Sequence, residues 1–287
     1  MAVSQSHTLG EFLGTFFEDL MKTPVREFSE KNGLYFDSYG LRKARKGKKV
    51  SWTDIHGSSH DLDFVIEKNG TDANMGTPIA FIELAWRRYT KHSKNKAQEI
   101  AGAVDPICER YKRIKPFKGA ILSGLFTENS LSQLKNDGFH VLYIPFDKVV
   151  QAFKVHGFDV FFDEETEESD IKRMYETITK KSNRPLLDKV RNELLAACTD
   201  EINAFIKDLE NSYNRKISSI YILPLHGVKI EVPNIEKAIR FVNDYEGLPD
   251  NCQLQYIEII VNYNNGSVIQ CQFKEKDEVV DFLNHIQ

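Results

Sequence analysis

The stretch that decides the fold is HDLDFVIEKNG, residues 60–70, followed after a polar loop by IAFIELA, residues 79–85. Both runs are apolar and rich in β-branched and aromatic residues, and the first ends at an Asn-Gly turn signal. The sequence therefore predicts two adjacent antiparallel strands of one sheet. Each run carries one acid in its apolar surroundings, Asp63 in the first and Glu83 in the second.

Helices and further strands are predicted on both sides of this pair. Apolar spacings of three and four predict an amphipathic helix before it, and Pro24 should end that helix and restart a shorter one. A second helix should begin at Ser93 and be kinked or divided by Pro106. The expected elements are a helix at 8–22, loop and strand at 34–56, strands at 60–68 and 79–85, a helix from 93, a strand at 119–125, a helix at 130–136, a strand at 139–146 and a helix at 147–153.

The carboxy-terminal part is predicted to form a separate unit. Helices are expected at 169–181 and 185–210, followed by a ββαββα pattern that holds a hairpin at 256–273 and a closing helix at 276–285. The sequence thus predicts a mixed α/β fold, in which helices flank a mixed sheet, with a C-terminal α+β module. The expected domains are a core at 1–165, a helical connector packing on it at 166–210, and the module at 211–287.

Composition excludes several classes of protein. With 287 residues, 41% of them hydrophobic and 28% charged, the chain is neither disordered nor fibrous. The four cysteines show no CxxC spacing, so neither a disulfide framework nor a zinc site is indicated. No apolar run reaches the roughly 18 to 20 residues of a membrane span, and no signal peptide is recognisable, so we expect no membrane partner and a cytoplasmic protein.

The positive charge is concentrated in one region. Residues 42–118 hold 17 Lys and Arg against 9 Asp and Glu, a balance of +8 in a chain whose net charge is −4. Such clusters favour polyphosphate binding, although a solvated loop is the alternative for each. The cations predicted to contact nucleic acid are Arg42, Lys43, Arg45 and Lys46 in the first cluster and Arg87, Arg88, Lys91 and Lys94 in the second.

The two acids in the strands indicate a metal site. Burying an ionised carboxylate without a partner costs several kcal/mol, so Asp63 and Glu83 should share a cation. If the strands pair, both acids converge at one edge of the sheet and offer the oxygen ligands that Mg²⁺ prefers. The alternative is purely structural, with the acids paired to Arg87 or Arg88.

This region resembles the PD-(D/E)xK restriction-endonuclease-like nucleases. That family places an Asp at the end of one strand and a Glu-x-Lys tripeptide on the next, in the order αβββαβ. The matching pieces here are HDLDFV, residues 60–65, and FIELA, residues 81–85, and the resemblance covers roughly residues 8–153. It implies a restriction-endonuclease-like core and Mg²⁺-dependent phosphodiester hydrolysis, with the metal, which Mn²⁺ could replace, held by Asp63 and Glu83.

One departure from the family motif is Ala85, which stands where the family usually has a lysine. That lysine normally helps to hold the attacking water and to stabilise charge on the phosphate. Lys96 on the following helix is the first choice as its replacement, with Lys94 or Arg87 as alternatives. Relocated acids in some relatives suggest Glu99 as an additional catalytic residue.

The first helix and the two tryptophans are open to two interpretations. Glu11 or Glu18 could contribute an outer ligand, or both could lie on an exposed helix face. Trp52 and Trp86 flank the basic stretches, and either could stack on a base, although core packing is the commoner role of such residues.

The sequence therefore predicts a Mg²⁺-dependent endonuclease acting on DNA. By analogy we expect a type II restriction or other defence nuclease that works as a homodimer, with the C-terminal module serving recognition or dimerisation. The alternative is a catalytically inactive protein of the same fold that binds nucleic acid or a partner protein. A nuclease acting on RNA or on repair junctions is a further alternative.

Overall fold

The structure is a computed structural model that describes residues 5–87, 89–90, 93–163, 165–181, 184–224, 229–245 and 256–286. The chain divides into two compact units. The first unit comprises Met1–Arg110 and Phe117–Glu210, and the second comprises Tyr111–Pro116 and Asn211–Gln287. Residues 111–116, which were expected in the core, therefore group with the C-terminal module.

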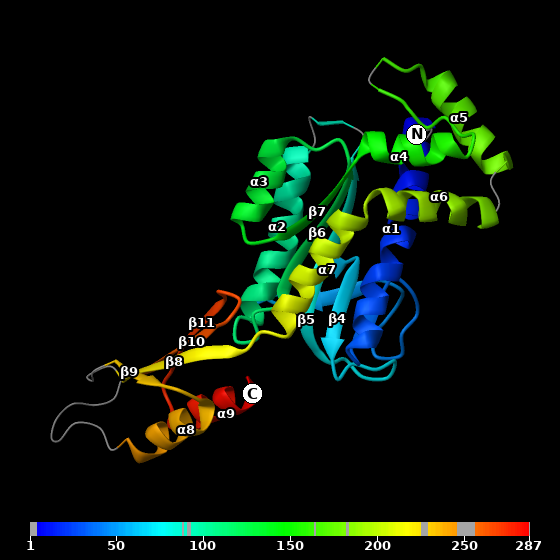
Figure 1. Cartoon of the computed structure of the whole chain (residues 1–287). Coiled ribbons are helices and arrows are strands. Elements are labelled where there is room, and N and C mark those ends of the chain that lie inside the picture. Colours follow the sequence, from blue (N-terminus) through cyan, green and yellow to red (C-terminus); the bar gives the residue numbers. More distant parts are fainter. Residues whose placement is uncertain are drawn as a thin grey trace. The chain divides into compact units, whose positions relative to one another are not determined.

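A five-stranded mixed sheet forms the centre of the first unit, in the order β1-β4-β5-β6-β7 (Figure 1). Strand β4 pairs antiparallel with both β1 and β5, whereas β5, β6 and β7 are parallel to one another. The predicted antiparallel pairing of the two apolar runs is confirmed. The strands are β1 (Tyr35–Ser38), β4 (Phe64–Lys68), β5 (Thr77–Arg87), β6 (Phe117–Gly124) and β7 (His140–Pro145).

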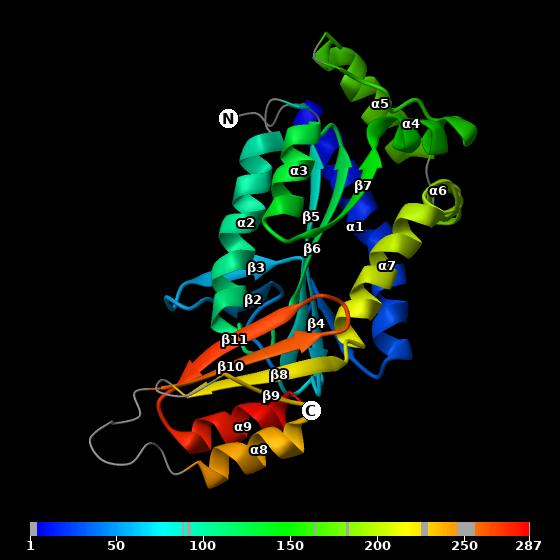
Figure 2. The same cartoon turned by 60° about the vertical axis from the view of Figure 1, so that its left-hand side comes forward.

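Helices cover both faces of this sheet (Figure 2), which confirms the mixed α/β class. Helices α2 and α3 lie on one face, and α1 and α7 lie on the other. Helix α4 joins α1 on its face, since the rings of Phe16 and Phe153 are 5.0 Å apart. The helices of this unit are α1 (Gln5–Lys31), α2 (Ser93–Arg110), α3 (Glu128–Asn136), α4 (Phe146–Val155), α5 (Glu168–Lys181), α6 (Arg184–Ala197) and α7 (Thr199–Tyr213).

Two prolines lie inside helices that they were expected to break. Pro24 falls within the continuous helix α1, and Pro106 falls within α2. An internal proline costs about 3 kcal/mol, because it removes a backbone hydrogen bond and clashes with the preceding turn. Burial of the neighbouring side chains opposes that cost: Met21 and Val25 in α1 and Ile107 in α2 are fully buried. Tertiary packing therefore overrides the local signal.

Two further boundaries differ from the sequence-based expectation. The run at 60–68 is not one strand, because β3 (Ser59–Leu62) leaves the sheet to pair with β2 (Val50–Thr53), and Asp63 forms a bend before β4 starts. The helix expected at 185–210 is divided into α6 and α7 around the buried Cys198. The bend places Asp63 immediately before β4.

The second unit is a four-stranded antiparallel sheet in the order β11-β10-β8-β9 with two helices. Its core is formed by alternate strand residues and by apolar residues of the two helices, including Ile259, Val242 and Phe282. Asn234 caps the first helix of this unit, because its side chain accepts a hydrogen bond from the peptide N–H of Lys237. The elements are β8 (Ile217–Pro224), β9 (Ile230–Val232), α8 (Ile235–Asp244), β10 (Ile257–Tyr263), β11 (Val268–Phe273) and α9 (Lys276–His285).

Candidate functional site

Asp63 and Glu83 lie close together where β4 begins and β5 nears its end. Phe64 pairs with Ile82, and Asp63 and Glu83 directly adjoin this last pair of the two strands. Asp63 itself forms a bend just before β4. The peptide N–H of Leu84 donates a hydrogen bond of 2.7 Å to Oδ2 of Asp63. The charge of Asp63 raises the pKa of Glu83, so the two acids are neighbours.

The two carboxyl groups are short of positive charge. Glu83 is only 8% exposed, and its Oε1 atom has no hydrogen-bond partner among the described residues. Burial, together with the charge of Asp63, raises the pKa of Glu83 to about 8, although Lys96 acts in the opposite direction. Burial also raises the pKa of Asp63, and the hydrogen bond from Leu84 opposes this rise. A cation placed between them would remove this electrostatic cost.

Lys96 is a cation whose charge lowers the pKa of both acids. It lies in the first turn of α2, and its Nζ is 3.4 Å from Oε2 of Glu99. Nη2 of Arg87 lies 3.6 Å from the same oxygen. Glu99 is 60% exposed and pairs with both cations, so its position suits holding Lys96 rather than binding a metal beside Asp63.

A pocket of about 440 Å³ adjoins Asp63, with residues of β5 on one side and helix α1 on the other. Glu11 and Glu18 both line it, as does Ala85. Glu18 is close enough to raise the pKa of Asp63, and Lys22, which is 3.0 Å from Oε1 of Glu18, lowers it. Helix α1 is therefore one wall of the candidate site.

Lys22 was not predicted from the sequence, and Glu18 was considered only as an outer ligand or an exposed residue. The available signal was the spacing of Glu11, Thr15, Glu18 and Lys22 at four, three and four residues. Such spacing forms a polar stripe along one side of a helix. Composition alone could not show that this stripe faces Asp63 and not solvent.

Further buried polar atoms at the same end of the sheet lack partners. Nε1 of Trp86, Nε of Arg87 and Oγ of Ser123 have no hydrogen-bond partner among the described residues. Trp86 and Ser123 are paired positions of β5 and β6, only three residues beyond Glu83 along β5. Buried polar groups without partners are uncommon, and three of them lie at this end of the sheet, close to Glu83.

Arg42 and Arg45 correct the prediction of nucleic-acid contacts. Nη1 of Arg42 is 2.8 Å from Oδ2 of Asp37 and also pairs with Glu67, and its side chain is 1% exposed. Nε of Arg45 is 3.1 Å from Oδ2 of Asp37, and its side chain is 7% exposed. Both guanidinium groups form ion pairs inside the protein, so neither is available to neutralise a phosphate. The sequence could not reveal this, because Asp37 and Glu67 lie outside the basic run.

The other predicted cations have different surroundings. Lys43, Lys46 and Lys94 are exposed. Arg87 is paired with Glu99 and is partly buried. Arg88 and Lys91 lie outside the described residues. Lys43, Lys46 and Lys94 thus retain the accessibility that a phosphate contact needs.

The two tryptophans both pack against aromatic residues. Trp52 is 6% exposed, and its ring lies 5.5 Å from that of Phe81. The ring of Trp86 lies 5.5 Å from that of Phe146, while Trp86 also lines the pocket near Asp63. Core packing is therefore the role of Trp52, whereas Trp86 borders the candidate site.

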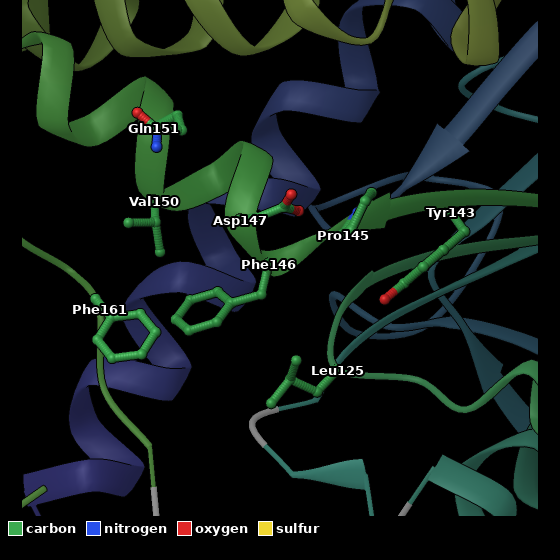
Figure 3. Close-up of a pocket in the computed structure, with 8 residues that line it drawn as sticks. All are labelled: Leu125, Tyr143, Pro145, Phe146, Asp147, Val150, Gln151 and Phe161. Atoms are coloured by element: carbon green, nitrogen blue, oxygen red, sulfur yellow. The ribbon is translucent and has the colours of Figure 1, made fainter.

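A second pocket, of about 410 Å³, lies around the start of α4 (Figure 3). The rings of Phe146 and Phe161 form its apolar wall, with centroids 6.1 Å apart. Asp147 and Gln151 also line this pocket, and none of the acids or cations predicted from the sequence does. Phe146 links the two regions because it also contacts Trp86.

Within the described part of the chain, no group of three or more His, Cys, Asp or Glu side chains is arranged to hold a metal ion. The candidate site offers two neighbouring carboxylates. One oxygen of Glu83 has no hydrogen-bond partner among the described residues. Mg²⁺ commonly binds through one or two carboxylates and completes its shell with water and substrate phosphate. The donor set of Asp63 and Glu83 therefore fits Mg²⁺ better than a metal that needs a full protein cage.

Comparisons with known proteins give little guidance. No family model matches the chain, and no curated protein matches it. One solved structure, described as a protein of unknown function, AF1548, is 12% identical, with 69% of this chain and 93% of that chain covered and a TM-score of 0.29. A score this low carries no argument. None of the described helices is long and apolar enough to cross a membrane.

Proposed function

We propose that this chain is a Mg²⁺-dependent endonuclease that hydrolyses phosphodiester bonds of DNA. The observation that carries the proposal is the carboxyl pair of Asp63 and Glu83, which is short of positive charge and includes one orphaned oxygen. Stability alone does not explain such a pair, because replacing it by neutral groups would remove an electrostatic cost. A function that needs a divalent cation does explain it.

Bound Mg²⁺ would act as a Lewis acid on a phosphoryl oxygen and lower the pKa of a water molecule. Asp63 and Glu83 are the residues that would hold it. The ammonium group of Lys96, on the next element, would stabilise negative charge that develops on the phosphate. In this role Lys96 replaces the lysine that the family usually has at the position of Ala85. Glu99 keeps Lys96 in position.

The order of elements supports the resemblance to PD-(D/E)xK nucleases. Helix α1 precedes three antiparallel sheet strands, β1, β4 and β5, which are followed by α2 and β6, and the hairpin of β2 and β3 is an insertion. By analogy we propose a type II restriction or other defence role and a homodimer with one site for each DNA strand. The second unit would then serve recognition or dimerisation.

Binding of nucleic acid without cleavage is a second candidate function. Ala85 favours it, since the residue that the family places next to the metal is absent. In that case the exposed lysines would bind DNA and the acids would be a remnant of a lost activity.

The experiment that separates these functions is plasmid cleavage by the purified chain with Mg²⁺. We expect nicked and linear products from the wild type, and a rate at least about 100-fold lower for Glu83→Gln, as for the loss of a principal electrostatic group. Glu193→Gln is the matched control, because it makes the same chemical change at an exposed residue of α6. It should cleave at the wild-type rate.

Two results would contradict the proposal. If wild type and Glu83→Gln cleave equally, the activity does not belong to this site. If neither cleaves but both bind DNA in a salt-sensitive manner, the second candidate function holds.

A further inference from the structure

The loop of residues 39–49, here called the basic loop, exposes apolar and cationic side chains together. Leu41 is 81% exposed, and Tyr39 is 59% exposed. The side chains of Lys43 and Lys49 are 82% and 69% exposed, and Lys46 and Lys48 are exposed as well. Nothing in the described part of the first unit covers Leu41, so burial in the fold does not account for this residue.

Despite this exposure, the basic loop is firmly held from beneath. Nε of Arg42 donates to the carbonyl of Thr71 over 3.0 Å, in addition to the ion pairs of Arg42 with Asp37 and Glu67. Arg45 donates to the carbonyl oxygens of Ser38 (3.0 Å) and Gly47 (3.1 Å). The loop therefore presents Leu41 and the lysines in a fixed arrangement, which lowers the entropy lost when a partner binds.

The basic loop starts beside the end of the sheet where the two acids lie, and it ends close to Asp61. Ser38, the last residue of β1, pairs with Phe64, and Phe64 pairs with Ile82. Tyr39 therefore leaves the sheet beside the row of Asp63 and Glu83. At the other end of the loop, Lys49 is 2.7 Å from Asp61, two residues before Asp63.

We propose that the basic loop enters a groove of duplex DNA next to the bond that is cut, and that Leu41 and Tyr39 wedge against sugars and bases there. The proposal rests on the proposed function for its location. Its support is charge complementarity: among the described residues, the four exposed lysines have two carboxylate partners, Asp72 and Asp61. Lysines on phosphates position such a loop, and an apolar wedge kinks the duplex by partly unstacking a base step.

An anionic membrane surface would also match lysines beside apolar side chains. The observations favour DNA, because membrane-binding segments bury a broad apolar face, whereas this loop offers two side chains. The position of the loop beside the acids also has no use in membrane binding.

The test is binding of the full chain, in a Glu83→Gln background that prevents cleavage, to perfect duplex DNA and to duplex with a central two-base mismatch. A wedge binds a flexible step more tightly, because unstacking there costs less. We expect a preference of about fivefold for the mismatched duplex, and Leu41→Ser should abolish it and weaken binding about 5- to 10-fold, typical of one apolar contact of about 1 to 1.4 kcal/mol.

The salt dependence separates the apolar wedge from the lysines that bind phosphates. Changing Lys43, Lys46 and Lys48 together to Gln should lower the slope of log K against log salt by about 0.9 for each phosphate that these lysines neutralise. Leu41→Ser should leave that slope unchanged. The control is Val155→Ser, since Val155 is also an exposed aliphatic residue, 64% exposed on α4, and should alter neither quantity.

Three outcomes overturn the inference. The first is that Leu41→Ser binds both duplexes with the same affinities as the Glu83→Gln background, and the second is that the background does not bind DNA at all. The third outcome is that Leu41-dependent binding is stronger to phosphatidylserine vesicles than to DNA. The proposed function is judged separately by plasmid cleavage. If Leu41→Ser cleaves plasmid at the wild-type rate, only the proposal for the basic loop is wrong. If DNA binding depends on Leu41 but the wild type does not cleave, only the proposed nuclease activity is wrong.

Discussion

The first unit contains two buried charged clusters, and they differ in how far their charges are compensated. Around Arg42, two carboxylates and backbone carbonyls surround one guanidinium, and Arg45 adds a second. Although burial alone lowers it, hydrogen bonds to Glu67 and Asp37 raise the pKa of Arg42. Around Glu83, by contrast, the neighbouring charge with the largest effect on its pKa is that of another acid, and one carboxylate oxygen has no partner among the described residues.

This difference distinguishes structural from functional charge. The Arg42 cluster lies under the basic loop and holds it, so its residues act inside the protein. Asp63 lines a pocket, and Glu83 beside it has a carboxylate oxygen without a hydrogen-bond partner among the described residues, so the pair is suited to a ligand that supplies positive charge. Loss of one charge should therefore destabilise the protein at the Arg42 cluster and stabilise it at the pair of Asp63 and Glu83.

Arg42→Met should have the largest effect. It leaves Asp37 and Glu67 buried without their main partner, so we expect the free energy of unfolding to fall by about 3 to 5 kcal/mol. Chemical denaturation monitored by circular dichroism measures this. Neutralising Glu67 as well, in Arg42→Met with Glu67→Gln, should recover part of the loss. If Arg42→Met unfolds at the wild-type midpoint, the cluster is not structural.

The outcome for Arg42 also shows where sequence reasoning reaches its limit. The pairing of β4 with β5 and the closing helix Lys276–His285 follow from local periodicity and turn signals, and both were predicted. The roles of Arg42 and Arg45 depend on partners 5 to 25 residues away, brought close only by the sheet. The position of Glu18 could not be predicted either, because the sequence does not show whether its side of α1 faces solvent or Asp63.

Glu83→Gln should have the opposite effect on stability, and the effect should depend on pH. The folded-state pKa of Glu83 is about 8, against an ordinary value of 4.5, so the folded protein binds the proton more tightly than the unfolded chain does. Wild-type stability is therefore lost as pH rises from 4.5 to 8. In EDTA the variant should be more stable at about pH 8, by up to about 5 kcal/mol, because each unit of the raised pKa corresponds to about 1.4 kcal/mol.

At pH 4.5 the stabilities of Glu83→Gln and wild type should differ little, since both side chains are then largely neutral in the folded protein. Urea denaturation at the two pH values measures the difference. A variant that is destabilised equally at both would mean that Glu83 has a partner and belongs with the structural charges.

Glu99→Gln should have the smallest effect. It removes the carboxylate that pairs with both Lys96 and Arg87 but leaves Asp63 and Glu83 in place. Because an exposed ion pair contributes about 0.2 to 1 kcal/mol, we expect only about a 2- to 5-fold lower rate of plasmid cleavage. Glu99→Asp should restore part of the rate. A loss as large as that of Glu83→Gln would make Glu99 a catalytic residue, as the resemblance first implied.

The central claim is that Asp63 and Glu83 together bind a divalent cation, and Mg²⁺ titration of thermal stability at about pH 8 tests it most directly. We predict that Mg²⁺ at about 100 times its Kd raises the free energy of unfolding of the wild type by about 2.7 kcal/mol, and raises the Tm accordingly. The Tm of Glu83→Gln should stay unchanged. An equal rise in both proteins, or none in the wild type, would contradict the claim.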